Sequence, residues 1–189
     1  MRNFDEIESA MRGMDAVIHL AVNTIDPRDD KLTFETNVFG TYNVLRGALR
    51  SRVGKTLIAS SAPVHTDGGL CSPGEDFAYD LTKTLQETIA RQFAQTYAMP
   101  VLALRLGHIV DGKRETDLHG AALADLAYCR GGWVCQYDVA RAFAAAIETD
   151  FTGYHLLHVI GSYQAASRFD LSAAKELIGF ECGEKFLGY

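Results

Sequence analysis

Long hydrophobic runs are absent from this chain of 189 residues. A helix that crosses a bilayer needs about 18 consecutive apolar residues, and no stretch of the sequence reaches that length. The first residues are polar and acidic, unlike the basic and apolar regions that open a signal peptide. We therefore expect a cytoplasmic protein that does not bind a membrane.

A basic excess is also lacking, because 24 acidic residues outnumber 18 lysines and arginines and give a net charge of −6. A surface that binds phosphates normally needs the opposite balance, so we expect no nucleic acid partner. The four cysteines show neither Cys-x-x-Cys spacing nor a companion histidine cluster. This pattern favours reduced thiols over disulfides, and it predicts no metal site.

The composition that remains, 48% hydrophobic and 22% charged, is typical of one globular domain spanning residues 1–189. Strand and helix signals alternate, which predicts an α/β fold: a Rossmann-like parallel sheet with helices on both faces. The expected strands are 16–21, 55–61, 101–107, 133–136 and 154–160. The expected helices are 4–12, 32–52, 77–98, 119–128, 138–148 and 170–178. Asp138 and Asp170 are expected N-caps, and Gly179 an expected C-cap.

Tyr79 and Lys83 stand four residues apart at the start of the expected helix 77–98. One helical turn separates them, so their side chains project from the same face. A free tyrosine, with a pKa near 10, is a poor base at neutral pH. A cation beside it favours the phenolate and lowers that pKa, so the pair suits proton transfer.

Seven segments place this pair in a wider context, and together they span nearly the whole chain. In chain order they are VIHLA, NVFGTYNVL, IASSAPVH, YDLTK, LALRLG, QYDVARAF and DLSAAKELIGF. The series resembles the extended short-chain dehydrogenase/reductase family, which is also called the NAD-dependent epimerase/dehydratase family. The compact region after Gly107 and the last segment are most similar to the uronate dehydrogenases of that family.

The resemblance implies a cofactor, NAD or NADP, and a role for each matching residue. Tyr79 would be the acid/base, Lys83 would lower the pKa of Tyr79 and hold the nicotinamide ribose, and Ser61 would bind the reacting oxygen of the substrate. The substrate portion would lie in 108–189. The family often has tyrosine where this chain has His65, so the resemblance does not carry a substrate contact over to that residue. The implied cofactor-binding residues are Leu20, Ala21, Asn37, Ser60, Tyr79, Lys83 and His108.

Two polar residues in expected strands have simpler interpretations. His19 lies within an apolar strand, where a buried, hydrogen-bonded histidine is more common than a ligand to substrate or metal. Arg105 is expected to form a buried ion pair rather than to contact substrate. Asn37 could likewise be a structural amide instead of a cofactor contact.

The glycine-rich turn G-x-x-G-x-x-G, which holds a dinucleotide pyrophosphate at a helix N-terminus, occurs nowhere in the chain. About two βα units of the family pattern are missing, each on the order of 30 residues. We therefore expect an N-terminally truncated Rossmann-like domain. It would be a fragment or a shortened gene product, with a variant cofactor arrangement as the third possibility.

The sequence thus predicts an NAD(P)-dependent oxidoreductase or epimerase that acts on a sugar or sugar acid. The alternative is a truncated, inactive dehydrogenase-like domain that serves as a binding or interaction module. The resemblance also implies a homodimer formed by helices 32–52 and 77–98, which carry apolar residues on more than one face.

Overall fold

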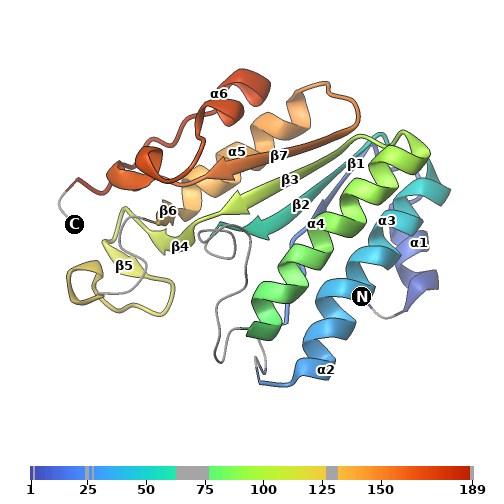
Figure 1. Ribbon diagram of the computed structural model, residues 1–189, viewed down its shortest axis with the longest axis horizontal. Helices are drawn as coiled ribbons and strands as arrows, with labels where there is room; N and C mark the ends of the chain where they lie inside the picture. Colours follow the sequence, from blue (N-terminus) through green and yellow to red (C-terminus); the bar gives the residue numbers. More distant parts are fainter. Residues whose placement is uncertain (2, 24–25, 27, 63–76, 127–131, 188–189) are drawn as a thin grey trace.

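The computed structural model describes residues 1, 3–23, 26, 28–62, 77–126 and 132–187. Its centre is a four-stranded sheet in the order β1-β2-β3-β7, and all three pairings are parallel, as predicted. The strands are β1 (Ala16–His19), β2 (Lys55–Ser61), β3 (Val101–Leu106) and β7 (Tyr154–Val159). Strand β1 lies at one edge of this sheet and β7 at the other (Figure 1).

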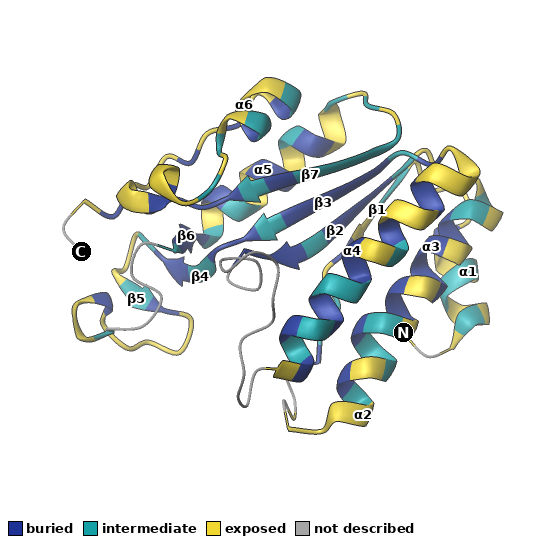
Figure 2. Cartoon of the chain, in the orientation of Figure 1, coloured by how far each residue is buried: buried dark blue, intermediate teal, exposed yellow. Residues whose placement is uncertain are grey.

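Helices cover both faces of the sheet. Consecutive residues of an inner strand point to opposite faces, and both are therefore fully buried. Leu57 packs with α5 (Gln136–Glu148) and α6 (Ser172–Ile178), whereas Ile58 packs with α3 (Gly40–Ser51) and α4 (Phe77–Tyr97). A strand covered on both faces reads as a continuous apolar run rather than an alternating one. Figure 2 shows the inner strands in the colour of buried residues, with helices on either side.

The expected helix 32–52 is a continuous helical segment of three parts. It begins as α2 (Asp30–Thr33), widens into a π-helix (Phe34–Phe39) and continues as α3. The Asp29 carboxylate caps its start by accepting a bond from the Leu32 amide at 2.9 Å. Short helix α1 (Phe4–Met11) packs against α3 at the side of the molecule that holds β1.

The prediction of a helix over 119–128 is wrong for the described part of that range, residues 119–126. This region contains β5 (Thr116–Asp117), a turn and a 3₁₀ helix (Leu123–Asp125), and residues 127–131 lie outside the described part. The buried Asp117 carboxylate accepts bonds from the amides of His119 and Ala121, each at 2.8 Å. These bonds fix a tight turn, since an aspartate side chain competes with the backbone for amide donors. Strand β5 joins β4 (His108–Asp111) and β6 (Trp133–Cys135) in a second small sheet.

Asp138 does not cap its helix, because α5 begins two residues earlier at Gln136. Its buried carboxylate instead accepts a bond from the Glu184 amide at 3.0 Å, which ties the C-terminal segment to α5. The same carboxylate pairs with Arg141 of α5 at 3.2 Å. Asp170 is not the N-cap residue of α6 either, because the helix begins at Ser172 and Leu171 holds the cap position; the Asp170 carboxylate nevertheless accepts a bond from the Ser172 amide at 2.9 Å. Gly179 ends α6 in the left-handed conformation, as predicted.

Two observations bear on the expected environment of the chain. Within the described residues, none of the helices combines the length and apolarity needed to cross a bilayer. Cys135 and Cys182 are buried free thiols, while Cys71 and Cys129 lie outside the described residues.

Candidate active site

The carboxyl ends of β1, β2 and β3 meet at one edge of the sheet, where they border a cavity of about 620 Å³. Ligands of open α/β sheets bind at this edge because the loops that follow the strands diverge there. Helices α4 and α5 and the turn after β5 close the remaining sides. The lining residues are Leu20, Val22, Ala59, Ser60, Ser61, Tyr79, Asp80, Lys83, Leu106, Gly107, His108, Ile109, Leu118 and Val139.

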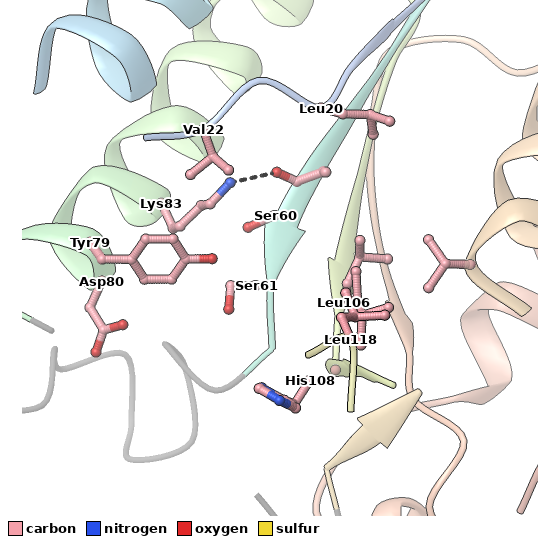
Figure 3. A pocket seen from close by; sticks show the side chains of 14 residues that line it. Leu20, Val22, Ser60, Ser61, Tyr79, Asp80, Lys83, Leu106, His108 and Leu118 are labelled. Atoms are coloured by element: carbon pink, nitrogen blue, oxygen red, sulfur yellow. Dashed lines mark hydrogen bonds between the residues drawn. The ribbon is translucent and has the colours of Figure 1, made fainter. Parts of the chain in front are cut away.

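Tyr79 and Lys83 enter this cavity from the first two turns of α4, as the four-residue spacing predicts. The Lys83 ammonium lies 5.7 Å from the centre of the Tyr79 ring. In Figure 3 the tyrosine ring and the lysine point toward the end of strand β2, where Ser60 and Ser61 lie. The structure therefore brings together the three predicted catalytic residues: Ser61, Tyr79 and Lys83.

The Lys83 side chain is buried, with 4% of its surface exposed. Its Nζ donates a hydrogen bond to the Ala59 carbonyl oxygen of β2 at 3.0 Å. Burial lowers the pKa of Lys83 from 10.5 to about 8, against the opposing effect of the negative charge of Glu87. The side chain therefore carries its charge at neutral pH, where an adjacent cation favours the phenolate form of a tyrosine.

Ser60 and Ser61 close β2, and both are buried at the cavity. The Ser60 hydroxyl donates to a carboxylate oxygen of Glu87 at 2.5 Å. Arg105 binds that carboxylate with two further hydrogen bonds, of 2.9 and 2.8 Å. The expectation of an ion pair at Arg105 is confirmed, with Glu87 buried and Arg105 partly buried. Ser60 has a structural partner as well as a place in the cavity wall.

His108 lies across the cavity from α4, at the start of β4, and is half-buried (Figure 3). Burial lowers the pKa of His108, the negative charge of Asp117 opposes this effect, and His119 adds to it. The ring is therefore neutral at pH 7. A neutral imidazole can donate one hydrogen bond and accept another, which suits contact with hydroxyl or amide groups.

Ala21 and Asn37 do not line this cavity. Asn37 is fully buried in the π-helix, where its Oδ1 accepts a bond from the Asn23 amide at 3.0 Å. Its Nδ2 donates to the Thr82 hydroxyl at 2.9 Å, and that hydroxyl donates to the Tyr79 carbonyl at 2.8 Å. Asn37 thus connects the segment after β1 to the turn of α4 that presents Tyr79.

His19 extends this network of buried polar groups. Its Nε2 lies 2.9 Å from the Thr41 hydroxyl, which donates to the Asn37 carbonyl and accepts from Gln86. Since the single hydroxyl proton of Thr41 is used, Nε2 of His19 must be the donor in their contact. The expectation of a buried, hydrogen-bonded histidine is confirmed.

Asp80, Val22, Leu118 and Val139 also line the cavity, although the sequence did not point to them. Glu87 was missed as well, yet it continues the spacing of four residues that joins Tyr79 to Lys83. Its place on that helical face was therefore open to prediction, whereas the approach of Leu118 depends on the turn after β5. His65 lies outside the described residues.

A parallel sheet covered on both faces, with a Tyr-x-x-x-Lys pair at its carboxyl edge, defines a Rossmann-like protein of the short-chain dehydrogenase type. The family model described as "NAD dependent epimerase/dehydratase family" matches residues 1–127. This match covers more than half of the chain, so the chain belongs to that family.

Known proteins similar to this chain act on sugars, and each is longer. The L-arabinose 1-dehydrogenase (NAD(P)(+)) of Haloferax volcanii is 24% identical over 167 residues, which cover 78% of this chain and 66% of that enzyme. A mutant uronate dehydrogenase from Agrobacterium tumefaciens, complexed with NAD, has a TM-score of 0.74 at 16% identity, covering 97% of this chain and 67% of that one. A dTDP-glucose 4,6-dehydratase from Streptomyces venezuelae with NAD bound has a TM-score of 0.74 at 17% identity, covering 99% and 74%. The chain thus spans about two thirds to three quarters of these proteins, and the two structural likenesses show the fold.

Proposed function

We propose that this chain carries the catalytic side of an NAD(P)-dependent oxidoreductase or epimerase that acts on a sugar or sugar acid. The observation that carries this proposal is the convergence of Ser61, Tyr79 and the buried Lys83 ammonium on one cavity at the carboxyl edge of the sheet. A buried cation beside a phenol favours its phenolate form, which can accept the proton of a sugar hydroxyl.

The residues present fit the nicotinamide end of the cofactor. Leu20, Val22 and Leu106 give the cavity apolar walls against which a ring can lie, and Lys83 offers an ammonium for ribose hydroxyls. When bound, the cofactor accepts or returns a hydride at the substrate carbon. Asn37, which is bonded to the turn of α4 that presents Tyr79, would support this end of the site, whereas Ala21 borders a different cavity next to α1.

The chain's own residues would move the proton. Tyr79 takes the proton of the substrate hydroxyl as the carbon is oxidised, and the Lys83 charge stabilises the phenolate that precedes this step. Ser61 orients the reacting oxygen by a hydrogen bond, and His108 faces the substrate from the opposite wall. In the reverse direction the Tyr79 phenol returns the proton to the carbonyl oxygen.

A small, free sugar or sugar acid is the substrate class that we favour. The segment between Gly107 and Trp133 is short, and its described residues, 108–126 and 132, form a strand pair, a turn and a 3₁₀ helix. It offers little surface to a nucleotide attached to the sugar. The similarity to an L-arabinose dehydrogenase supports the same class, whereas the fold is shared equally with a uronate dehydrogenase and a nucleotide-sugar dehydratase.

A non-catalytic binding module is the second candidate, and the sequence favours it in one respect. No glycine-rich turn is present to hold the pyrophosphate, and the loss of several oriented contacts weakens binding by several kcal/mol. The two candidates differ in what the cavity does with a substrate, so both binding and turnover must be measured.

Calorimetry with NAD, NADP and nicotinamide mononucleotide tests the cofactor part. We expect weak binding of all three by the chain of 189 residues, and further loss in Lys83→Met. Micromolar affinity for NAD would contradict our account of the absent glycine-rich turn. If Lys83→Met binds the mononucleotide as tightly as the wild-type chain does, Lys83 does not contact the ribose.

Turnover is tested on the chain joined to a glycine-rich βα segment from a relative. We expect oxidation of pentoses or uronates in preference to UDP-glucose. Tyr79→Phe should abolish turnover and leave cofactor binding nearly intact, because the ring still packs but cannot carry the proton. Ser61→Ala should reduce turnover less. Full activity in Tyr79→Phe would contradict the proposed role of the tyrosine, and binding of sugars without any turnover would favour the binding module.

We further propose that two copies associate through α3 and α4. Aromatic side chains are exposed along this pair of helices: Phe39, the last residue of the π-helix before α3, is 51% exposed, Tyr42 of α3 41% and Tyr97 of α4 54%. Phe39 stacks on Tyr42, which contacts Phe93 edge to face, so the rings form one continuous apolar surface. A surface of this kind commonly marks a protein interface.

A further inference from the structure

Glu87 occupies the third position of an inward-facing row on α4, one turn after Lys83 and two turns after Tyr79. Only 2% of its surface is exposed. Three donors converge on its carboxylate: the Ser60 hydroxyl at 2.5 Å, Arg105 Nε at 2.9 Å and Arg105 Nη2 at 2.8 Å. A buried carboxylate is stable only when it is paired and hydrogen-bonded in this way.

The partners of Glu87 belong to the two central strands beside the cavity. Ser60 of β2 and Arg105 of β3 are directly paired in the sheet register. The carboxylate therefore joins both strands to α4 just behind the wall that holds Ser61. Lys83 makes a parallel connection one turn earlier, through its hydrogen bond to the Ala59 carbonyl. Together these bonds set the distance and rotation of α4 relative to the end of β2.

We propose that Glu87 is a positioning residue of the candidate active site. Its carboxylate fixes the end of β2 against α4 and compensates the buried Lys83 ammonium. The catalytic meaning of this role rests on the proposed function, whereas the charge compensation is a property of the chain alone. A group that acts in this way shapes the site without touching substrate.

The charges around Lys83 show why Glu87 has this effect. On α4 the lysine faces Glu87 and shares the cavity with Tyr79 and Asp80. From the neighbouring strands Lys83 faces His19, which is neutral at pH 7. It also faces Arg105, which is bound to the same Glu87 carboxylate. His108 lies across the cavity. Arg105 thus offsets part of the negative charge that Glu87 presents to Lys83.

This arrangement predicts shifts of opposite sign in two variants of the same ion pair. Glu87→Gln keeps the size and an acceptor for Ser60, but it leaves the partly buried Arg105 and the buried Lys83 without a compensating negative charge. The Lys83 ammonium should then lose its proton at lower pH. Arg105→Gln removes the positive charge that offsets the Glu87 carboxylate. Lys83 then experiences more of the negative charge of Glu87, so it should keep its proton to higher pH. Both variants remove the same ion pair and should lower thermal stability.

The test is a pH titration of Lys83 by nuclear magnetic resonance in chains labelled with ¹³C-lysine, without cofactor or sugar. The signal is assigned by its loss in Lys83→Met. We expect the midpoint to fall by about one pH unit or more in Glu87→Gln, and to rise by a measurable fraction of a unit in Arg105→Gln. Glu176→Gln, an exposed acidic position on α6, is the matched control and should leave the midpoint unchanged.

A wild-type midpoint in Glu87→Gln, together with lower thermal stability, would mean that the ion pair is structural only and would overturn the proposal. If Glu87→Gln does not fold, Arg105→Gln decides, since an unchanged or lowered midpoint there also overturns it. The outcome is independent of the proposed enzyme activity. Shifted midpoints in a protein that turns over no sugar would refute the function and leave the role of Glu87 intact.

Discussion

The buried imidazole of His19 should make the folded protein sensitive to acid. His19 is 4% exposed and donates to the Thr41 hydroxyl at 2.9 Å. Burial, reinforced by the positive charges of Lys83 and the N-terminus, lowers the pKa of His19 from 6.5 to about 4. Between these two values the unfolded chain binds a proton that the folded chain does not. The free energy of unfolding must therefore fall as the pH falls from 6.5 to 4.

The magnitude follows from the gap of about 2.5 pH units between the two states. At about 1.4 kcal/mol per unit, His19 can account for a loss of up to about 3.5 kcal/mol. This is a large share of the roughly 5–15 kcal/mol that stabilises a typical domain. His19→Gln retains a donor at a similar distance from Cα but cannot be protonated, so it should lack this part of the pH dependence.

Urea unfolding at pH 7, 5.5 and 4.5, followed by the fluorescence of the single tryptophan, Trp133, measures this difference. We expect the wild-type protein to lose about 2–3 kcal/mol more than His19→Gln over this range. His119→Gln, at an exposed position in the turn after β5, is the control and should follow the wild-type curve. Parallel curves for wild type and His19→Gln would refute the reasoning, because they would mean that His19 gains its proton equally easily in both states.

Three further changes test the core, the cavity wall and the proposed association. Leu104→Ala removes a fully buried side chain from the core between the sheet and α5, and should cost about 2–5 kcal/mol in urea unfolding; a loss below 1 kcal/mol would contradict this packing. Gly107→Ala would place a methyl group against the carbonyl oxygen of Gly132 and should cost about 1–3 kcal/mol by the same measurement, whereas unchanged stability would contradict this close approach. Tyr42→Glu puts a charge in the aromatic surface of α3 and should shift a micromolar dimer to monomer in sedimentation velocity. The control, Tyr163→Glu, changes an exposed tyrosine outside α3 and α4 and should leave the dimer intact. A monomeric wild-type protein would contradict the proposed interface.

The sequence by itself determined the parallel sheet and its helices. Apolar runs such as 55–61 and 101–106 can be satisfied only by strands covered on both faces, and the helical signals between them supply the cover. The proximity of Tyr79 to Lys83 was equally predictable, because the geometry of a helix alone brings residues four apart onto one face. The place of Ser61 in the site was implied by the family resemblance, and it agrees with the rule that ligands of parallel sheets bind at the carboxyl ends of the strands.

Only the tertiary structure decided which partners the polar side chains find. Asp117 binds two amides and fixes a turn where a helix was expected, and Asp138 binds the distant Glu184 amide instead of capping α5. Ser60 and Arg105 meet on Glu87 because the sheet register brings two strands beneath one helical turn. Local sequence sets what a side chain can donate or accept. The competition among partners far apart in the chain is settled only when the elements pack.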